Sequence, residues 1–469
     1  MEKRTMEGML RASAGQYGDI PALVFGDRQM NYRELYDQVT ALACTFAERG
    51  FRGKRIDLRP ELSAEWILVF LALTAAGAVV VLHEPMLDIS GYLPDISMTA
   101  DAAELYAYPR GGSLAEHTDE DDTAVIIFTS GTSGRHKGVM LSHRNIISDA
   151  LLGAEMIGAD ALKAGDRTIP VLPVFHMFGI TASILAPLCI GLTVFVIPDM
   201  KYVIRSLAQI RPRILFLVPM IAKTLLSRVR LLLKNGMPRE AIREQVLGGL
   251  PMIVSGGAAL QPELIDAFAE LGVALLNGYG ITECSPIVTT STFGRNVPGS
   301  VGRVGQTSYA EVRIIDGRIH VSGDIVMQGY CGDEPSPFKT ICGKRWFDTR
   351  DNGCISEDGD LFITGRSSSL IILDDGNNIS PEEIEQLFEE YEAVGSVLVY
   401  EKHNTLCASV YPAQEICPED AAGLVADIVE AVNHRLPPYK RVKRWSIRTQ
   451  DFRRTSLKKI IRSEVNYDG

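Results

Sequence analysis

The sequence predicts an α/β protein: a large N-terminal domain of helix-covered sheets with a small β-barrel-like unit, then a small α+β C-terminal domain. As far as residue 300, short apolar runs alternate with amphipathic segments, which is typical of parallel sheets covered by helices. After Val301 the chain changes to short strands separated by glycine-rich turns. A boundary near Arg366 then divides it into an N-terminal domain, 1–366, and a C-terminal domain, 367–469.

Local signals predict the N-terminal elements in order. Asn31, followed three residues later by Glu34, is a helix start, and the helix runs to Gly50. Ser63 begins a second helix that ends near Gly77. The next predicted elements are a strand at 79–82, a strand at 193–197, a helix at 202–210 and a strand at 214–218.

Later elements follow from the same signals. Strands are predicted at 311–315, 318–322 and 370–373. Ser380 is predicted to cap a helix, with Pro381 in its first turn and Glu383 completing a capping box. A last helix is predicted at 418–435.

Composition narrows the function classes. The chain has 469 residues, 46% hydrophobic and 22% charged, which is ordinary for a globular protein. The net charge of −11 argues against nucleic acid as the main partner. Its eight cysteines form no CxxC pair, so neither a zinc site nor a disulfide framework is expected, and free thiols suit a reducing compartment.

Two apolar stretches need comparison with a membrane span, and the second of them is long enough for one. Residues 66–82 are short and broken by Gly77, and residues 170–198 are interrupted by prolines and glycines. A buried helix followed by a buried strand is the better interpretation of each. No apolar stretch follows Met1, so no signal peptide is expected, and we predict a cytoplasmic protein without a membrane span.

Residues 126–139 contain the first candidate site. An apolar run ending at Phe128 predicts a buried strand, and a loop of small and hydroxylated residues follows it. Glycines let backbone N–H groups turn toward an anion, hydroxyls add donors, and Lys137 adds a positive charge. The loop residues are Thr129, Ser130, Gly131, Thr132, Ser133 and Gly134. This chemistry suits a polyphosphate, although a plain surface turn is the alternative.

A second candidate site lies at 277–286. It places an aromatic ring, a hydroxyl and a carboxylate, those of Tyr279, Thr282 and Glu283, within five residues on a glycine-containing loop. A hairpin turn with an incidental acid is the alternative.

Taken together, these stretches resemble the adenylate-forming (AMP-binding) superfamily, and most closely its bacterial long-chain fatty acid–CoA ligases. Residues 129–139 are similar to the motif TSGTTGxPKGV, with His136 in place of proline, and residues 279–283 match YGxTE. Lys137 is followed by Gly138, so the loop is not the common GxxxxGK[ST] type.

The resemblance implies roles for individual residues. Tyr279 would pack against the adenine of ATP, Thr282 would contact phosphate, and Glu283 with Thr129 would hold Mg²⁺. Asp351, in a Thr-Arg-Asp stretch where the family has TGD, would accept hydrogen bonds from the ribose hydroxyls. The remaining nucleotide-binding residues that the resemblance implies are Gly257, Ala258, Asn277, Gly278, Gly280 and Arg366.

The C-terminal motif is at 454–462. It resembles the family's ending with its catalytic lysine, which aligns with Lys459, whereas Lys458 stands where glycine is typical. Gly376 would belong to the loop that reaches the thiol channel when a mobile C-terminal domain turns. Ser367–Ser369 replace the usual charged residue at the pivot. A solvated basic tail is the alternative for the lysine run.

Residues 171–179 predict which carboxylic acid would be the substrate, because they resemble the LPxFHxxG segment of fatty acyl-CoA synthetases. That likeness places His176 and Phe178 beside the acyl group. The apolar run that follows offers no charge for an amino group, which favours a medium- or long-chain fatty acid.

The expected function is therefore ATP- and Mg²⁺-dependent activation of this carboxylic acid, with transfer to coenzyme A. The expected catalytic residues are Lys459, Glu283, Thr282 and Lys137. Two alternatives stay open: delivery of the acyl group to an acyl carrier protein, and a degenerate member that binds nucleotide or acyl ligand without turnover.

Overall fold

The computed structural model describes residues 3–111, 118–130, 136–157, 161–332, 335–366, 371–372, 378–414, 416–454, 460 and 462. The chain forms two compact units. Unit 1 contains residues 1–313, 320–348 and 357–361, and unit 2 contains residues 314–319, 349–356 and 362–469. The predicted boundary at residue 366 stays a prediction for the division into functional domains.

The larger sheet of unit 1 has eight strands. In spatial order they are β13 (Ile287–Thr290), β12 (Ala274–Gly280), β11 (Met252–Ser255), β10 (Ile214–Leu217), β8 (Arg167–Thr168), β9 (Thr193–Phe195), β1 (Pro21–Phe25) and β2 (Arg28–Asn31). The six strands from β12 to β1 are parallel, and the edge strands β13 and β2 are antiparallel to their neighbours.

The second sheet of unit 1 has six strands. Their order is β16 (Gly329–Tyr330), β7 (His136–Ser142), β6 (Thr123–Ser130), β4 (Val79–Leu82), β3 (Arg55–Leu58) and β5 (Met98–Ala100). The four strands β5, β3, β4 and β6 are parallel, while β7 runs antiparallel to β6 and β16 runs antiparallel to β7. Both sheets confirm the predicted parallel core.

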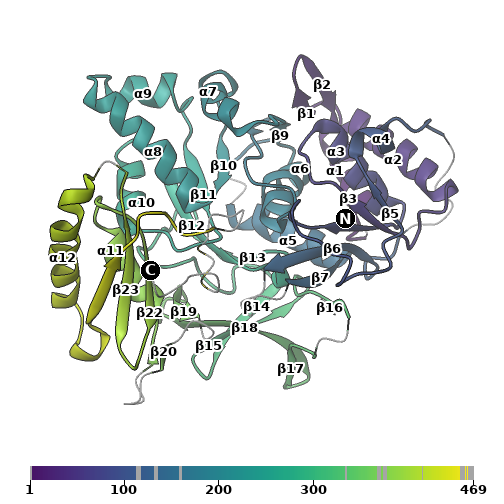
Figure 1. Ribbon diagram of the computed structural model, residues 1–469. Coiled ribbons are helices and arrows are strands. Elements are labelled where there is room, and N and C mark those ends of the chain that lie inside the picture. The colour runs from purple at the N-terminus through teal and green to yellow at the C-terminus, as the bar shows by residue number, and fades with distance from the viewer. Residues whose placement is uncertain are drawn as a thin grey trace. The chain divides into compact units, whose positions relative to one another are not determined.

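Helices cover both sheets (Figure 1). Those of unit 1 are α1 (Met6–Tyr17), α2 (Tyr32–Glu48), α3 (Ala64–Ala75), α4 (Ala102–Tyr106), α5 (His143–Ile157), α6 (Ala186–Cys189), α7 (Met200–Ile210), α8 (Pro219–Lys234), α9 (Arg239–Gln245) and α10 (Pro262–Ala269), with a π-helix at Phe178–Leu185 and a 3₁₀ turn at Thr282–Cys284. Apolar residues of α7, α8 and α10 pack with those of β10 to β12 into one buried cluster, which excludes water from this face of the larger sheet.

Two predicted helix starts, at Asn31 and Ser63, are confirmed in detail. Asn31 accepts a hydrogen bond from the backbone of Glu34, whose carboxylate accepts one from Asn31 in return, which is a full capping box. Ser63 accepts from the backbone of Trp66. The four predicted elements at 79–82, 193–197, 202–210 and 214–218 correspond to β4, β9, α7 and β10.

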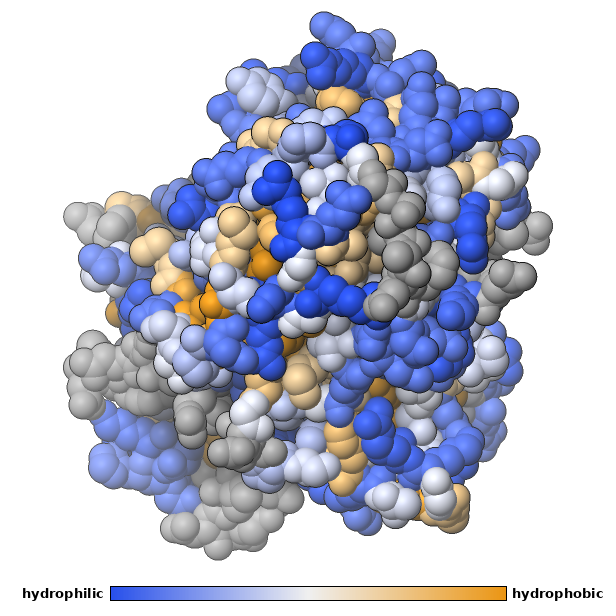
Figure 2. Space-filling model, turned by 90° about the vertical axis from the view of Figure 1, so that its right-hand side faces the viewer, coloured by the Kyte–Doolittle hydropathy of each residue, from blue (hydrophilic) through white to orange (hydrophobic). Residues whose placement is uncertain are grey.

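Neither apolar stretch forms a membrane span in the structure. Residues 66–82 become most of α3 followed by β4, and residues 170–198 contain the π-helix, α6 and β9. No helix within the described ranges is long and apolar enough to cross a bilayer. The face in Figure 2 is mostly hydrophilic, with apolar residues in small groups.

A third sheet follows in the chain. Its order is β14 (Ala310–Ile315), β15 (Arg318–Gly323), β18 (Lys344–Ile355) and β17 (Phe338–Ile341), and β19 (Leu361–Arg366) also pairs with β18. The predicted strands at 311–315 and 318–322 are confirmed within one residue.

Unit 2 ends in a small α+β fold. Its strands are β20 (Ile371–Ile372), β21 (Asn378–Ile379), β22 (Val394–Glu401), β23 (Leu406–Pro412) and β24 (Arg444–Ile447), and its helices are α11 (Pro381–Glu389), α12 (Pro418–His434) and a 3₁₀ turn at Pro438–Lys440. Both α-helices pack against the sheet β22–β23–β24, as Figure 1 shows, and share a buried apolar core with it.

One predicted cap is wrong. The helix begins at Pro381 as expected, but Ser380 makes no side-chain capping bond. Its hydroxyl instead donates to the carboxylate of Glu382 at 3.0 Å, so the expected reciprocal pair with Glu383 does not form.

A buried carboxyl joins α5 to the larger sheet. Asp149 is fully buried, and its Oδ1 accepts a hydrogen bond from the backbone N–H of Ile287 at 2.9 Å, while Oδ2 has no partner among the described residues. Burial raises the pKa of this carboxyl well above its usual range. Asp149 is therefore expected to be protonated in the folded protein at pH values where the unfolded chain has lost that proton.

This carboxyl makes stability depend on pH. A folded-state pKa above the unfolded value, about 4, means that its stabilising contribution declines as the pH rises from that value toward the folded pKa. Asp149→Asn removes the titration, so its free energy of unfolding relative to the parent should rise between pH 5 and pH 7, by at most about 1.4 kcal/mol per pH unit. Urea unfolding of both proteins at each pH measures this difference, and a constant difference would contradict the assignment.

Two glycines at the end of β12 give a matched pair of substitutions. A Cβ on Gly280 would lie 2.0 Å from the carbonyl oxygen of Pro286, whereas one on Gly278 would meet nothing closer than 3.4 Å. Gly280→Ala should lower stability by about 1–3 kcal/mol through overpacking, and Gly278→Ala should have a smaller effect. Melting temperatures of the two variants test this, and equal losses would disprove the close approach.

Candidate active site

The predicted phosphate-binding loop leaves from a tight strand pair. Residues 124–128 of β6 are buried between β4 and β7, which explains the apolar run in the sequence. The β6–β7 register pairs Thr129 with Lys137, so these two residues lie opposite each other at the base of the loop. Gly131, Thr132, Ser133 and Gly134 lie outside the described residues, as does the side chain of Ser130.

The segment around Glu283 is held by long-range hydrogen bonds. After β12, Thr282 and Glu283 form a 3₁₀ turn, which the backbone bond from Ile281 to the carbonyl of Pro286 closes at 2.9 Å. The carbonyl of Glu283 accepts from the backbone N–H of Met327 at 2.9 Å, and the hydroxyl of Ser285 donates to the carbonyl of Ile325 at 2.8 Å. These bonds therefore close the segment on itself and attach it to residues 325–327.

Tyr330 joins the two predicted motifs, and sequence reasoning missed it. Its hydroxyl donates to Oε1 of Glu283 at 2.9 Å, and the ammonium of Lys137 lies 4.6 Å from the centroid of its ring. The structure thus brings Lys137 and Glu283, which come from two separate motifs, to the same tyrosine, and Thr129 lies opposite Lys137 on the neighbouring strand. Their roles in the site stay predictions. The sequence around Tyr330 offers only an aromatic beside a glycine, which is a common pair.

Strand β12 ends at Gly280, just before the turn that contains Glu283, and it carries several of the predicted nucleotide-binding residues. Asn277 is buried, and its side-chain amide donates to the carbonyl of Ser300 at 2.9 Å. Tyr279, 7% exposed, pairs with Thr289 of β13, next to Gly278 and Gly280 on the same strand. The nucleotide contacts predicted for these residues stay predictions.

Gly257 and Ala258 follow the carboxyl end of β11, where parallel sheets commonly bind ligands. Gly257 has a φ of +84°, a conformation that glycine adopts readily. A Cβ on the preceding Gly256 would lie 3.2 Å from the ring of Phe178, so that aromatic side chain lies directly against this backbone.

The predicted acyl residues make aromatic contacts. The rings of Phe178 and Phe216 meet edge to face at 6.3 Å, and those of Phe175 and His176 are 4.7 Å apart. His176 and Phe178 are half-buried, so neither is sealed in the core. An apolar surface beside the 256–258 backbone is suited to an uncharged chain.

Asp351 and Arg366 belong to unit 2. Asp351 is 4% exposed, and its backbone N–H donates to the hydroxyl of Thr349, which in turn donates to the carbonyl of Ile319 at 2.8 Å. The side chain of Arg366 lies outside the described residues, as do Lys459 and Gly376. Their predicted roles stay predictions.

The donor set in unit 1 fits Mg²⁺. This ion binds few protein oxygens and keeps waters and substrate phosphates in its remaining positions. Glu283 offers a half-buried carboxylate of which one oxygen is oriented by Tyr330, and Thr129 offers a half-buried hydroxyl at the base of the loop. Both are hard oxygen ligands of the kind that Mg²⁺ prefers.

Comparison with known proteins agrees with this geometry. A long-chain-fatty-acid–CoA ligase of Bacillus subtilis is 28% identical over 360 residues, which cover 74% of this chain and 62% of that protein. The peroxisomal OPC-8:0-CoA ligase 1 of Arabidopsis thaliana is 28% identical over 354 residues, 72% of this chain and 62% of that protein. The chain thus matches about three-fifths of the length of these relatives.

Solved structures share the fold. An anthranilate CoA ligase in complex with anthranoyl-AMP superimposes with a TM-score of 0.80 at 21% identity, covering 97% of this chain and 95% of that one. The o-succinylbenzoate CoA synthetase of Bacillus subtilis, with ATP and magnesium, gives 0.79 at 22% identity, covering 97% and 98%. At such identities the likeness extends to the fold alone.

A family model described as AMP-binding enzyme matches residues 10–91 and 92–331, which is more than half of the chain. The match contains both motifs that the structure brings together at Lys137 and Glu283. On this evidence the chain belongs to the AMP-binding, adenylate-forming enzyme family.

Proposed function

We propose that the chain activates a carboxylic acid with ATP and transfers the acyl group to coenzyme A. The observation that carries this proposal is the cluster of Lys137, Tyr330 and Glu283 beside Thr129 at the base of the loop. It combines a cation for phosphate oxygens with hard oxygen ligands for a metal ion, in a chain of the AMP-binding family.

In the first half-reaction a carboxylate oxygen attacks the α-phosphorus of ATP. The bond from that phosphorus to its bridging oxygen breaks, and pyrophosphate leaves with the bonding electrons. Lys137 and the loop hydroxyls stabilise the charge on the phosphate oxygens, and Lys459 contacts the carboxylate and the α-phosphate. Glu283 and Thr129 would hold Mg²⁺, which would supply further positive charge to the phosphates.

In the second half-reaction a thiolate sulfur attacks the acyl carbon. The thioester forms and AMP leaves, so that ATP, acid and thiol become AMP, pyrophosphate and acyl-thioester. We assign Gly376 to the thiol side of this step. Exclusion of water at each stage protects the acyl-adenylate, which hydrolysis would otherwise destroy.

The proposed acid is a medium- or long-chain fatty acid. The half-buried ring of Phe178 lies against Gly256 and meets the buried ring of Phe216, and these uncharged surroundings favour an apolar acyl chain. Among the relatives, one is named for long-chain fatty acids and others for 4-coumarate, so aromatic acids are the comparison in the experiment.

Coenzyme A is the proposed thiol, since the relatives are named as CoA ligases. The alternatives are an acyl carrier protein as acceptor, or binding of nucleotide without turnover. We also propose a cytoplasmic location.

Pyrophosphate release tests the proposal. With ATP, Mg²⁺ and a panel of fatty and aromatic acids, we expect acid-dependent release that is fastest with a fatty acid and is accelerated by coenzyme A. Lys459→Ala should lower the rate about 100-fold, because charge stabilisation at the α-phosphate is lost. Lys458→Ala is the matched control for the lysine pair and should have little effect.

The outcomes separate the alternatives. Release that responds to acid but not to coenzyme A, and that rises with an acyl carrier protein, would establish the carrier-dependent reaction. ATP binding without pyrophosphate release in the presence of any acid would establish the degenerate form, which binds nucleotide without turnover. A larger loss from Lys458→Ala than from Lys459→Ala would reassign the catalytic lysine.

A further inference from the structure

One short segment connects the two charged motifs of the proposed site. We name Asp324–Cys331 the bridging segment. Its Met327 N–H donates to the carbonyl of Glu283 at 2.9 Å. A little further on, β16 pairs with β7, and the Cys331 N–H donates to the carbonyl of Gly138 at 2.8 Å, next to Lys137. The bridging segment therefore fixes Glu283 and Lys137 relative to each other through its backbone.

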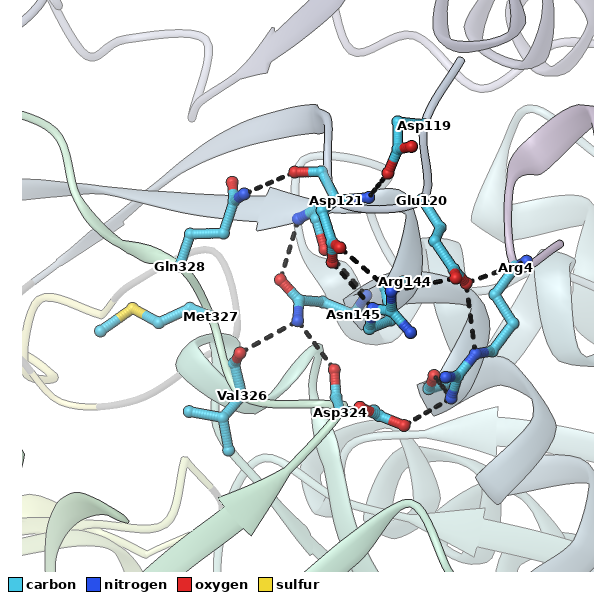
Figure 3. Close-up of polar contacts among 12 residues, drawn as sticks. Arg4, Asp119, Glu120, Asp121, Arg144, Asn145, Asp324, Val326, Met327 and Gln328 are labelled. Carbon is cyan, nitrogen blue, oxygen red and sulfur yellow. Dashed lines mark hydrogen bonds and ion pairs between the residues drawn. The ribbon is translucent and has the colours of Figure 1, made fainter. Parts of the chain in front are cut away.

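Two polar side chains, the buried Asn145 and the half-buried Gln328, hold the bridging segment in place (Figure 3). The amide of Asn145 donates to the carbonyl of Asp324 at 2.7 Å and to that of Val326 at 3.0 Å. The amide N–H of Gln328 donates to the carbonyl of Asp121 at 2.8 Å, as Figure 3 shows. Its amide oxygen accepts from the hydroxyl of Thr123 at 2.7 Å. Since buried carbonyls are costly to leave unsatisfied, this network restricts the segment to one path.

The ordered backbone sets the place of the Tyr330 side chain. In the β16–β7 register Tyr330 pairs with Val139, and Val139 lies two residues from Lys137 on β7. Residues two apart on a strand share a face of the sheet, so the ring of Tyr330 and the ammonium of Lys137 meet across neighbouring strands at 4.6 Å. From the same ring the hydroxyl reaches Glu283 Oε1 at 2.9 Å.

We propose that Tyr330 is a positioning residue of this site: through its hydroxyl it orients the Glu283 carboxylate for Mg²⁺, and through its ring it supports Lys137 for the phosphates. The inference rests on the proposed function for the identity of these ligands. A hydrogen bond to one carboxylate oxygen limits rotation of the group and leaves the other oxygen for a cation. A cation over an aromatic ring is stabilised by the ring's electron density.

Two variants of Tyr330 test the role of its hydroxyl and the role of its ring separately. Tyr330→Phe removes only the hydroxyl, so it should raise the Mg²⁺ concentration needed for half-maximal enhancement of ATP binding about tenfold, consistent with the loss of one bond to a charged group. ATP affinity without Mg²⁺ should stay within twofold of the parent. Tyr330→Leu also removes the ring, so it should in addition weaken ATP binding without Mg²⁺ about threefold or more.

Calorimetric titration of ATP at fixed Mg²⁺ concentrations measures both quantities without turnover. Tyr36→Phe is the matched control, because its hydroxyl also bonds a carboxylate, Glu7 at 3.1 Å, in another part of unit 1. It should leave both quantities unchanged. Combining Tyr330→Phe with Glu283→Gln should add no further change in Mg²⁺ dependence, since the orienting bond then has no carboxylate to act on.

The results decide the inference independently of turnover. An unchanged Mg²⁺ dependence in Tyr330→Phe, or an equal shift in Tyr36→Phe, would overturn it. So would additive effects of Tyr330→Phe and Glu283→Gln. If the parent binds MgATP but activates no acid, the proposed function fails while the binding data still test the role of Tyr330.

Discussion

The position of β7 between β6 and β16 is the constraint on which the cluster depends. Its pairing with β6 places Thr129 and Lys137 opposite each other, and its pairing with β16 brings Tyr330 onto the same face. Both pairs are antiparallel, at the edge of a sheet whose inner strands are parallel. A slip of one residue in either pair would turn the side chains to opposite faces, so register alone decides whether the charged groups meet.

Buried polar groups fix that register over long distances in the sequence. Asn145 satisfies two carbonyls of the bridging segment, and Asp149, one turn later on α5, satisfies the backbone N–H of Ile287 just beyond the Glu283 turn. Helix α5 therefore holds both segments that carry the cluster. Each bond replaces water for a buried backbone group, and loss of one would leave that group unsatisfied. Specific geometry at the site thus follows from polar groups in the interior, and apolar packing alone would not provide it.

Local patterns predicted much of the fold, because caps and strands depend on neighbouring residues. The helix starts at Asn31 and Ser63 are confirmed, since their partners lie three residues away. The cap predicted at Ser380 does not form, although the helix begins where the pattern places it, and the serine hydroxyl donates to Glu382. Tyr330 is 47 residues from Glu283 in the chain, so only strand pairing brings them together. The order of the motifs in the sequence predicted which loops carry the site. The strand register that brings their side chains together is seen only in the structure.

Two departures from the family motifs become clearer in this light. Arg350 stands where the family has glycine, and its φ is +63°, a left-handed conformation that glycine adopts more readily than arginine. Such a residue costs about 1 kcal/mol or more relative to glycine, and the hydrogen bonds around Thr349 help to hold it. His136 replaces proline at the start of β7, where it pairs with Ser130 and its ring lies 6.2 Å from that of Tyr92. Proline has no N–H for strand pairing, so this exchange permits β7 to extend to the end of the loop. Both departures therefore act on main-chain conformation: Arg350 occupies a left-handed backbone without glycine, and His136 supplies a backbone N–H that proline would lack.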